Sequence, residues 1–117
     1  MKIAIVGSRN FESLHLVTRY VEELPNDATV ISGGAVGVDT FAERAAKKHS
    51  LKTIIHLPNW KEYGNQAGFI RNQLIVNDAD QVVAFWNGLS RGTKDTIKRA
   101  EKAGKMVTVI DEQGNRT

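Results

Sequence analysis

The feature that most constrains the fold is a regular alternation between two hydrophobic periods along the chain. Short apolar runs, each long enough for one buried strand, alternate with longer segments whose apolar residues recur at helical spacing. The predicted strands are residues 2–7, 29–32, 52–57, 81–86 and 105–110. The predicted helices are residues 12–24, 39–49, 66–77 and 93–103. Strands and helices that alternate in this way are typical of right-handed crossovers and a parallel sheet covered on both faces.

These elements predict a single α/β domain over residues 1–117, with a doubly wound parallel sheet of five strands and helices on both faces. We expect the strand order 3-2-1-4-5. Ligands of such sheets bind outside the carboxyl ends of the strands, where the strand order reverses. In this chain that point lies between the first and fourth strands. A chain of 117 residues can bury most of its apolar surface without disulfides or metals.

Composition excludes several classes of protein. There is no cysteine, which excludes a disulfide scaffold, a thiolate zinc site and a cysteine nucleophile. The three histidines lack metal-ligand spacing, so we expect neither a metal nor a cofactor. No apolar run approaches the roughly 20 residues that span a bilayer, and the N-terminus does not resemble a signal peptide. We therefore expect a cytoplasmic protein with no membrane partner. The net charge of +3 permits anionic ligands, although a dedicated duplex-DNA binder usually carries a denser basic stripe.

Glycines are concentrated at one end of the predicted sheet. Eight of the ten lie in loops that follow the first four strands. Glycine in a loop serves a positive φ angle or a close backbone approach. Tight turns explain part of this set, but not its asymmetry, so we expect a ligand at this end. The glycines assigned to the site are Gly7, Gly33, Gly34, Gly37 and Gly92.

The loop after the first strand begins Gly7-Ser8-Arg9. A small residue lets a ligand approach, Ser8 offers a hydroxyl group, and Arg9 can bind a phosphate through two hydrogen bonds. The alternative is that Arg9 is a surface cation paired with Glu12. The G-x-G-x-x-G fingerprint is absent, which argues against an NAD dehydrogenase site.

The loop after the second strand opens a helix and contains Gly33, Gly34 and Gly37. Successive free backbone N–H groups at a helix start can form an anion-binding nest. Asp39 at the start of that helix has two interpretations. It accepts hydrogen bonds from a ribose, or it is the N-cap of the helix.

Polar residues also stand at the start of the two later helices. Arg71 and Asn72 are early enough in the third helix to face the site, or else form an ordinary solvated pair. Ser90, Gly92 and Thr93 follow the fourth strand, where they can hold a phosphate on a helix N-terminus. Ser90 or Thr93 could equally be only a helix cap.

Trp60 and Tyr63 lie in the loop after the third strand. Their rings could stack on a nucleobase. More often, aromatic residues in such a position only pack a long loop against the domain. The sequence leaves both interpretations open.

Several segments match one superfamily in order along the chain. They are Ile5-Val6-Gly7-Ser8-Arg9, Ile31-Ser32-Gly33-Gly34-Ala35 with Gly37 and Asp39, Ala67-Gly68 with Ile70-Arg71-Asn72, Ala84-Phe85-Trp86, and Ser90-Arg91-Gly92-Thr93 with Asp95-Thr96-Ile97. This chain resembles the SLOG superfamily of Rossmann-like nucleotide-binding domains, and most closely its YspA/YpsA-related branch. The resemblance implies one SLOG-type domain over residues 1–117. It also implies that the chain binds or senses a small phosphate-bearing ligand, such as a mononucleotide or an ADP-ribose-like molecule. Relatives often dimerise, so a homodimer is also expected.

Two relatives suggest other functions. The DNA-processing protein A family, which binds single-stranded DNA, is similar at Gly7-Ser8-Arg9, from Ser32 to Asp39 and at Arg71-Asn72. The Lonely Guy enzymes cleave a nucleoside monophosphate between base and ribose 5-phosphate, and their Gly-Thr pair is present here.

The similarity to the Lonely Guy enzymes is incomplete. Thr96 stands where those enzymes carry a glutamate, and the turn before the Gly-Thr pair differs. If the chain is a nucleotide hydrolase of this phosphoribohydrolase type, Asp39 or Asp95 would be the acid–base group.

Overall fold

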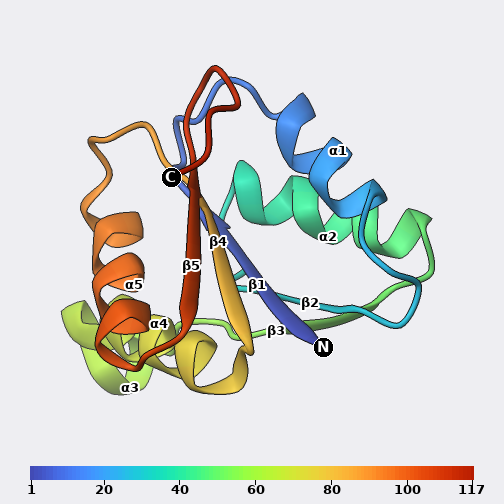
Figure 1. Cartoon of the computed structure of the whole chain (residues 1–117). Coiled ribbons are helices and arrows are strands. Elements are labelled where there is room, and N and C mark those ends of the chain that lie inside the picture. The colour runs from blue at the N-terminus through green and yellow to red at the C-terminus, as the bar shows by residue number, and fades with distance from the viewer.

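The computed structural model describes all 117 residues. Its core is one five-stranded sheet in the order β3-β2-β1-β4-β5, in which every neighbouring pair is parallel (Figure 1). The strands are β1 (Lys2–Gly7), β2 (Thr29–Ser32), β3 (Lys52–Ile55), β4 (Gln81–Phe85) and β5 (Met106–Ile110). The predicted fold class and strand order are therefore confirmed.

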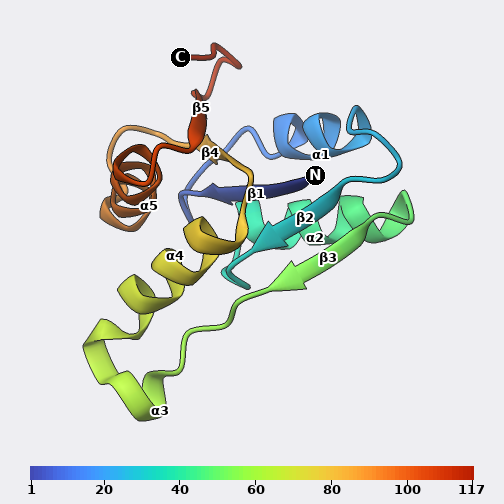
Figure 2. The same cartoon turned by 60° about the horizontal axis from the view of Figure 1, so that its bottom comes forward.

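Helices cover both faces of the sheet. They are α1 (His15–Glu22), α2 (Val38–Lys48), α3 (Trp60–Tyr63), α4 (Ala67–Asp78) and α5 (Arg91–Lys102), with a 3₁₀ turn, Gly64–Gln66, before α4. Figure 2 shows α1 and α2 on one face of the sheet and α4 and α5 on the other. This arrangement follows from the right-handed crossovers that connect parallel strands.

Alternating side chains of β1 divide the core into two layers. Ile3 and Ile5 belong to the apolar cluster beneath α1 and α2. Ala4 and Val6 belong to the cluster beneath α4 and α5. Successive strand residues point to opposite faces, so a central strand must be apolar throughout, as the sequence of β1 is.

The local structure departs from the sequence predictions around β3. β3 ends at Ile55 rather than at residue 57, and the short helix α3 follows an extended segment. The side chain of Asn59 caps α3 by accepting a hydrogen bond from the Glu62 N–H at 3.1 Å. The chain end is also ordered, because Thr117 and Val109 exchange two backbone hydrogen bonds beside β5.

The buried face of α4 is rotated from the expected one. Helical spacing in the sequence predicts an inward stripe of Ala67, Ile70 and Leu74. Ala67 is buried as expected, but Leu74 is 47% exposed. The other buried residues, Asn72, Ile75 and Val76, are also three and four residues apart, and this second face packs on the sheet.

No helix in the structure is both long and apolar enough to cross a membrane. No group of three or more His, Cys, Asp or Glu side chains is placed to hold a metal ion.

Candidate functional site

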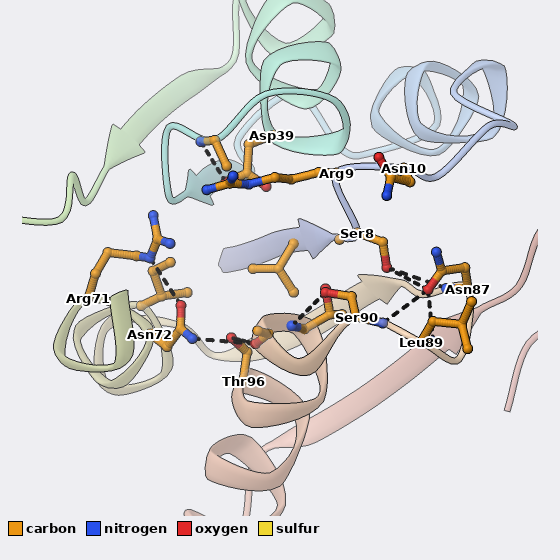
Figure 3. A pocket seen from close by; sticks show the side chains of 16 residues that line it. Ser8, Arg9, Asn10, Asp39, Arg71, Asn72, Asn87, Leu89, Ser90 and Thr96 are labelled. Atoms are coloured by element: carbon orange, nitrogen blue, oxygen red, sulfur yellow. Dashed lines mark hydrogen bonds between the residues drawn. The ribbon is translucent and has the colours of Figure 1, made fainter. Parts of the chain in front are cut away.

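A cavity of about 460 Å³ opens at the carboxyl ends of β1 and β4. This is where the strand order reverses, as the sequence predicted. Figure 3 shows side chains from the loop after β1, the start of α2, α4 and the loop before α5 around it. Of the sixteen lining residues, the polar ones are Ser8, Arg9, Asn10, Asp39, Arg71, Asn72, Asn87, Ser90, Thr93 and Thr96.

The end of β1 is tightly packed. A Cβ atom at Gly7 would lie 2.7 Å from the backbone oxygen of Phe85 and 2.8 Å from the Cβ of Val38. The Ser8 hydroxyl is buried and donates a hydrogen bond to Oδ1 of Asn87 at 3.2 Å. Gly7 and Ser8 therefore line the pocket but also join β1 to the loop after β4.

Arg9 is exposed, and its side chain forms no hydrogen bond or ion pair with another residue. In particular, it does not pair with Glu12, whose backbone N–H instead bonds to Glu112. Figure 3 shows the Arg9 side chain extending across the pocket towards Asp39. Its guanidinium group is available to an anionic ligand.

The expected anion nest after β2 is occupied by the protein itself. Oδ2 of Asp39 accepts hydrogen bonds from the backbone N–H groups of Gly33 at 2.9 Å and Ala35 at 3.2 Å. Gly33, Gly34 and Gly37 do not line the pocket. The Gly33 and Ala35 N–H groups are therefore engaged by Asp39, and a direct contact of these glycines with a phosphate stays a prediction. Their loop needs glycine because Gly34 and Gly37 have φ angles of +70° and +82°.

Asp39 is neither exposed nor an N-cap. Gly37 is the N-cap of α2, and Asp39 is only 4% exposed. Burial raises the pKa of Asp39 to about 6 from an ordinary value of 3.8, against the opposing effect of the two N–H donors and Arg71. The carboxylate thus shapes the loop from within, and its charge is sensitive to pH near neutrality.

Arg71 crosses from α4 to the loop after β2. Its Nη1 group donates to the carbonyl oxygen of Gly33, and its Nε group donates to Oδ1 of Asn72 at 3.0 Å. The remaining amino group, Nη2, donates to no protein acceptor. Burial lowers the pKa of Arg71 from its ordinary value. Arg71 is thus a charged group held at the pocket wall with one amino group unused.

Asn72 connects Arg71 to α5. Its amide nitrogen donates to Oδ2 of Asp95 at 3.1 Å and to the carbonyl oxygen of Gly92 at 3.4 Å. The same Asp95 oxygen accepts a 2.7 Å hydrogen bond from Nε of Arg99. Asp95 does not line the pocket, so it supports Asn72 from behind.

The N-terminus of α5 forms the opposite wall. Ser90 is the N-cap, and its hydroxyl oxygen accepts a hydrogen bond from the Thr93 N–H at 3.3 Å. Ser90, Gly92 and Thr93 all line the pocket as well. The two interpretations of Ser90 are therefore compatible, because a capped first turn still carries the positive end of the helix dipole.

Sequence reasoning missed three polar lining residues, Asn10, Asn87 and Thr96. Asn87 lies two residues after the end of β4, and its Oδ1 accepts from the N–H groups of Leu89 at 2.9 Å and Ser90 at 3.2 Å. A polar residue at the start of the loop after a central strand was the available signal. Thr96 lies about one turn into α5; the resemblance to the Lonely Guy enzymes pointed to this position, but the sequence gave no reason to assign its hydroxyl group to the site.

A parallel sheet of this order with a polar pocket at its reversal point defines the class of protein. The chain has a Rossmann-like fold with a polar pocket at the reversal point, and its match to a family model places it in the SLOG superfamily. The sequence model of the family described as DNA recombination-mediator protein A matches residues 1–63, which is more than half of the chain. This protein belongs to that family.

The chain is similar in sequence to a phage protein and in fold to two solved proteins. The gene 61 protein of Mycobacterium phage D29 is 32% identical over 113 residues, covering 88% of this chain and 90% of the phage protein. DNA processing protein A from Streptococcus pneumoniae has a similar structure, with a TM-score of 0.79 and 24% identity over 92% of this chain. DNA processing protein A from Helicobacter pylori has a TM-score of 0.72 and 21% identity over 93% of this chain.

The two solved proteins are longer than this chain. The matched region covers 49% of the S. pneumoniae chain and 64% of the H. pylori chain. At this level of identity, the two structures establish a shared fold.

Proposed function

We propose that this protein binds single-stranded DNA and holds a phosphodiester group and its sugar in the pocket at the carboxyl ends of β1 and β4. The composition of the lining carries this proposal. It offers two guanidinium groups, several hydroxyl and amide groups and the first turn of α5, but no aromatic side chain. Such groups suit a phosphate and a sugar, whereas nothing in the pocket encloses a base.

Two further observations favour DNA as the ligand. The chain belongs to a family described by DNA recombination, and the H. pylori relative was solved for its single-stranded DNA binding mode. The net charge of +3 also suits a polyanion, because phosphate contacts supply most of the affinity of sequence-independent binding.

A free phosphate-bearing nucleotide, such as a mononucleotide or an ADP-ribose-like molecule, is the second candidate ligand. The cavity volume of about 460 Å³ favours it, because small-molecule sites usually enclose roughly 300–1,000 Å³. In this alternative the protein is a nucleotide sensor of the YspA-related kind, acting as a single domain over residues 1–117 or as a homodimer.

Hydrolysis of such a nucleotide has weaker support. Asp39 is the only carboxylate in the pocket lining, and its Oδ2 already accepts two backbone hydrogen bonds. Thr96 does line the pocket, so the position that carries a glutamate in the Lonely Guy enzymes faces the site with a hydroxyl group instead.

The test is fluorescence anisotropy with a labelled single-stranded oligonucleotide, with AMP and ADP-ribose as competitors. We expect the oligonucleotide to bind and Arg71→Ala to weaken binding by about tenfold or more, since charge-assisted hydrogen bonds to a phosphate are lost. Lys98→Ala removes a charge from the exposed side of α5 and serves as the matched control.

The other outcomes separate the candidates. Binding of AMP or ADP-ribose that depends on Arg71, without binding of the oligonucleotide, would favour the nucleotide sensor. Equal effects of Arg71→Ala and Lys98→Ala would show that the pocket is not the binding site.

A further inference from the structure

The pocket contains no aromatic side chain, but an exposed tryptophan contacts α4, the helix that carries Arg71. Trp60 is 55% exposed in α3. Large aromatic side chains are usually buried to a high degree, and a loop-packing role would bury this one. The structure therefore disfavours the interpretation in which Trp60 only packs the loop against the domain.

The Trp60 ring contacts α4 at a glycine, Gly68. Its Cη2 atom is 3.6 Å from the position that a Cβ atom at Gly68 would occupy. Gly68 thus leaves one side of the helix open to the indole. Figure 2 shows α3 at the amino end of α4, where α4 projects from the sheet.

The same side of α4 leads into the pocket. Residues three and four apart share one face of a helix, so Gly68 lies in line with the pocket residues Arg71 and Asn72. Three residues advance about 4.5 Å along a helix axis, so Gly68 and Arg71 lie about one turn apart on α4, with Gly68 nearer its amino end.

We propose that Trp60 is a stacking platform for a nucleobase of the single strand whose phosphate is held at Arg71. This inference rests on the proposed function and adds to it a site for the base. Stacking on an indole tolerates any base, because every base has a π face. The arrangement therefore predicts binding without strong sequence preference.

The test compares two labelled single strands with the same number of phosphates, oligo-dT and an abasic strand of equal length. Stacking is worth about 1–3 kcal/mol per base, so the wild-type protein should prefer oligo-dT by about tenfold. Trp60→Ala should abolish this preference and leave the affinity for the abasic strand unchanged. Trp60→Phe, which keeps a π face, should retain most of the preference.

Phe69→Ala is the matched control. Phe69 is 43% exposed and adjacent to Gly68, but one residue turns a helix by about 100°, so its side chain leaves α4 in another direction. Phe69→Ala should keep the preference for oligo-dT. A second readout is intrinsic fluorescence, which oligo-dT should quench in the wild-type protein and not in Trp60→Phe, where Trp86 remains.

Three results with the Trp60→Ala variant would overturn the inference. These are an unchanged preference in Trp60→Ala, an equal loss of affinity for both strands, and a change of oligomeric state in Trp60→Ala that accounts for its weaker binding. If the wild-type protein binds neither strand, the proposed function itself is wrong. If it binds both strands equally, only the stacking platform is wrong.

Discussion

Single residues at this site have distinct physical roles, and two glycines illustrate the difference. An added Cβ atom at Gly7 would meet backbone and Cβ atoms, at 2.7 Å from the Phe85 oxygen and 2.8 Å from the Val38 Cβ. At Gly33 it would meet the end of a side chain, 2.5 Å from Nη1 of Arg71. Packed backbone cannot move aside, whereas a guanidinium group can. Gly7 therefore matters for stability, and Gly33 matters for where Arg71 lies.

The two alanine substitutions should separate these roles. Gly7→Ala should lower the free energy of unfolding by about 1–3 kcal/mol, the usual cost of overpacking a core. Gly33→Ala should be less destabilising but should weaken oligonucleotide binding, by up to the effect of Arg71→Ala. Urea denaturation and anisotropy measure the two effects. Normal binding by Gly33→Ala would mean that the observed position of Arg71 is not needed for function.

The raised pKa of Asp39 predicts that ligand binding depends on pH. This pKa of about 6 lies above the ordinary value of 3.8, so the carboxyl group is mostly protonated at pH 5 and mostly ionised at pH 7.5. A negative charge beside Arg71 opposes an anionic ligand. We expect oligonucleotide affinity to be several-fold higher at pH 5 than at pH 7.5 and Asp39→Asn to flatten this dependence. A profile unchanged in Asp39→Asn would assign the titration to another group.

The same shift affects stability, with a definite sign. A raised pKa in the folded state means that the folded protein holds this proton more tightly than the unfolded chain does. The contribution of Asp39 to the free energy of unfolding should therefore fall as pH rises from about 3.8 to about 6, and then level off. Urea denaturation of the wild-type protein and of Asp39→Asn across this pH range measures this contribution as the difference between their free energies of unfolding.

At the scale of elements, the first turn of α5 both ends a loop and forms a wall of the pocket. Ser90 caps the helix through the Thr93 N–H, and the backbone oxygen of Ser90 accepts a 3.0 Å hydrogen bond from Nε1 of Trp86. α4 is joined to α5 through Asn72 and Asp95. The two helices therefore position the pocket residues together, so a change in either one should reach Arg71.

Two substitutions at Ser90 separate capping from ligand binding. Ser90→Ala should cost about 1 kcal/mol of stability because the helix loses its cap. Ser90→Asp should restore stability, since Asp is an equally good N-cap, but its negative charge should weaken binding of the oligonucleotide. Thermal unfolding and anisotropy provide the two readouts. Tighter binding by Ser90→Asp would contradict the placement of a phosphate at this helix N-terminus.

Sequence patterns predicted an element correctly where its apolar residues fit only one kind of secondary structure and one buried face. Pro25 follows the first helix, and the apolar run of β4 has no alternative to a buried strand. The inward face of α4 was mispredicted because two stripes of similar spacing compete, and the sheet beneath decides between them. α3 was not predicted because its cap and its four residues are too short to form a periodic pattern.

At the scale of the whole molecule, charge should control affinity through salt. For single strands, the logarithm of the binding constant falls by about 0.7 per neutralised phosphate for each unit of the logarithm of salt concentration. Arg9 has no protein partner, so Arg9→Ala should make this slope shallower by about 0.7. Lys98→Ala should leave the slope unchanged. Equal slopes for Arg9→Ala and the wild-type protein would remove Arg9 from the phosphate contacts.

The sequence by itself determined the sheet, its strand order and the edge at which the pocket lies. Apolar runs of strand length, helical periods and the handedness of crossovers are local or topological rules, and they leave few alternatives. The tertiary structure alone decided what each site residue does. Asp39 fills the loop expected to hold a phosphate, and Arg71 reaches a carbonyl group 38 residues before it in the chain. Hydrogen bonds between distant segments depend on the angle and reach of each side chain in the packed fold, which residue spacing does not encode.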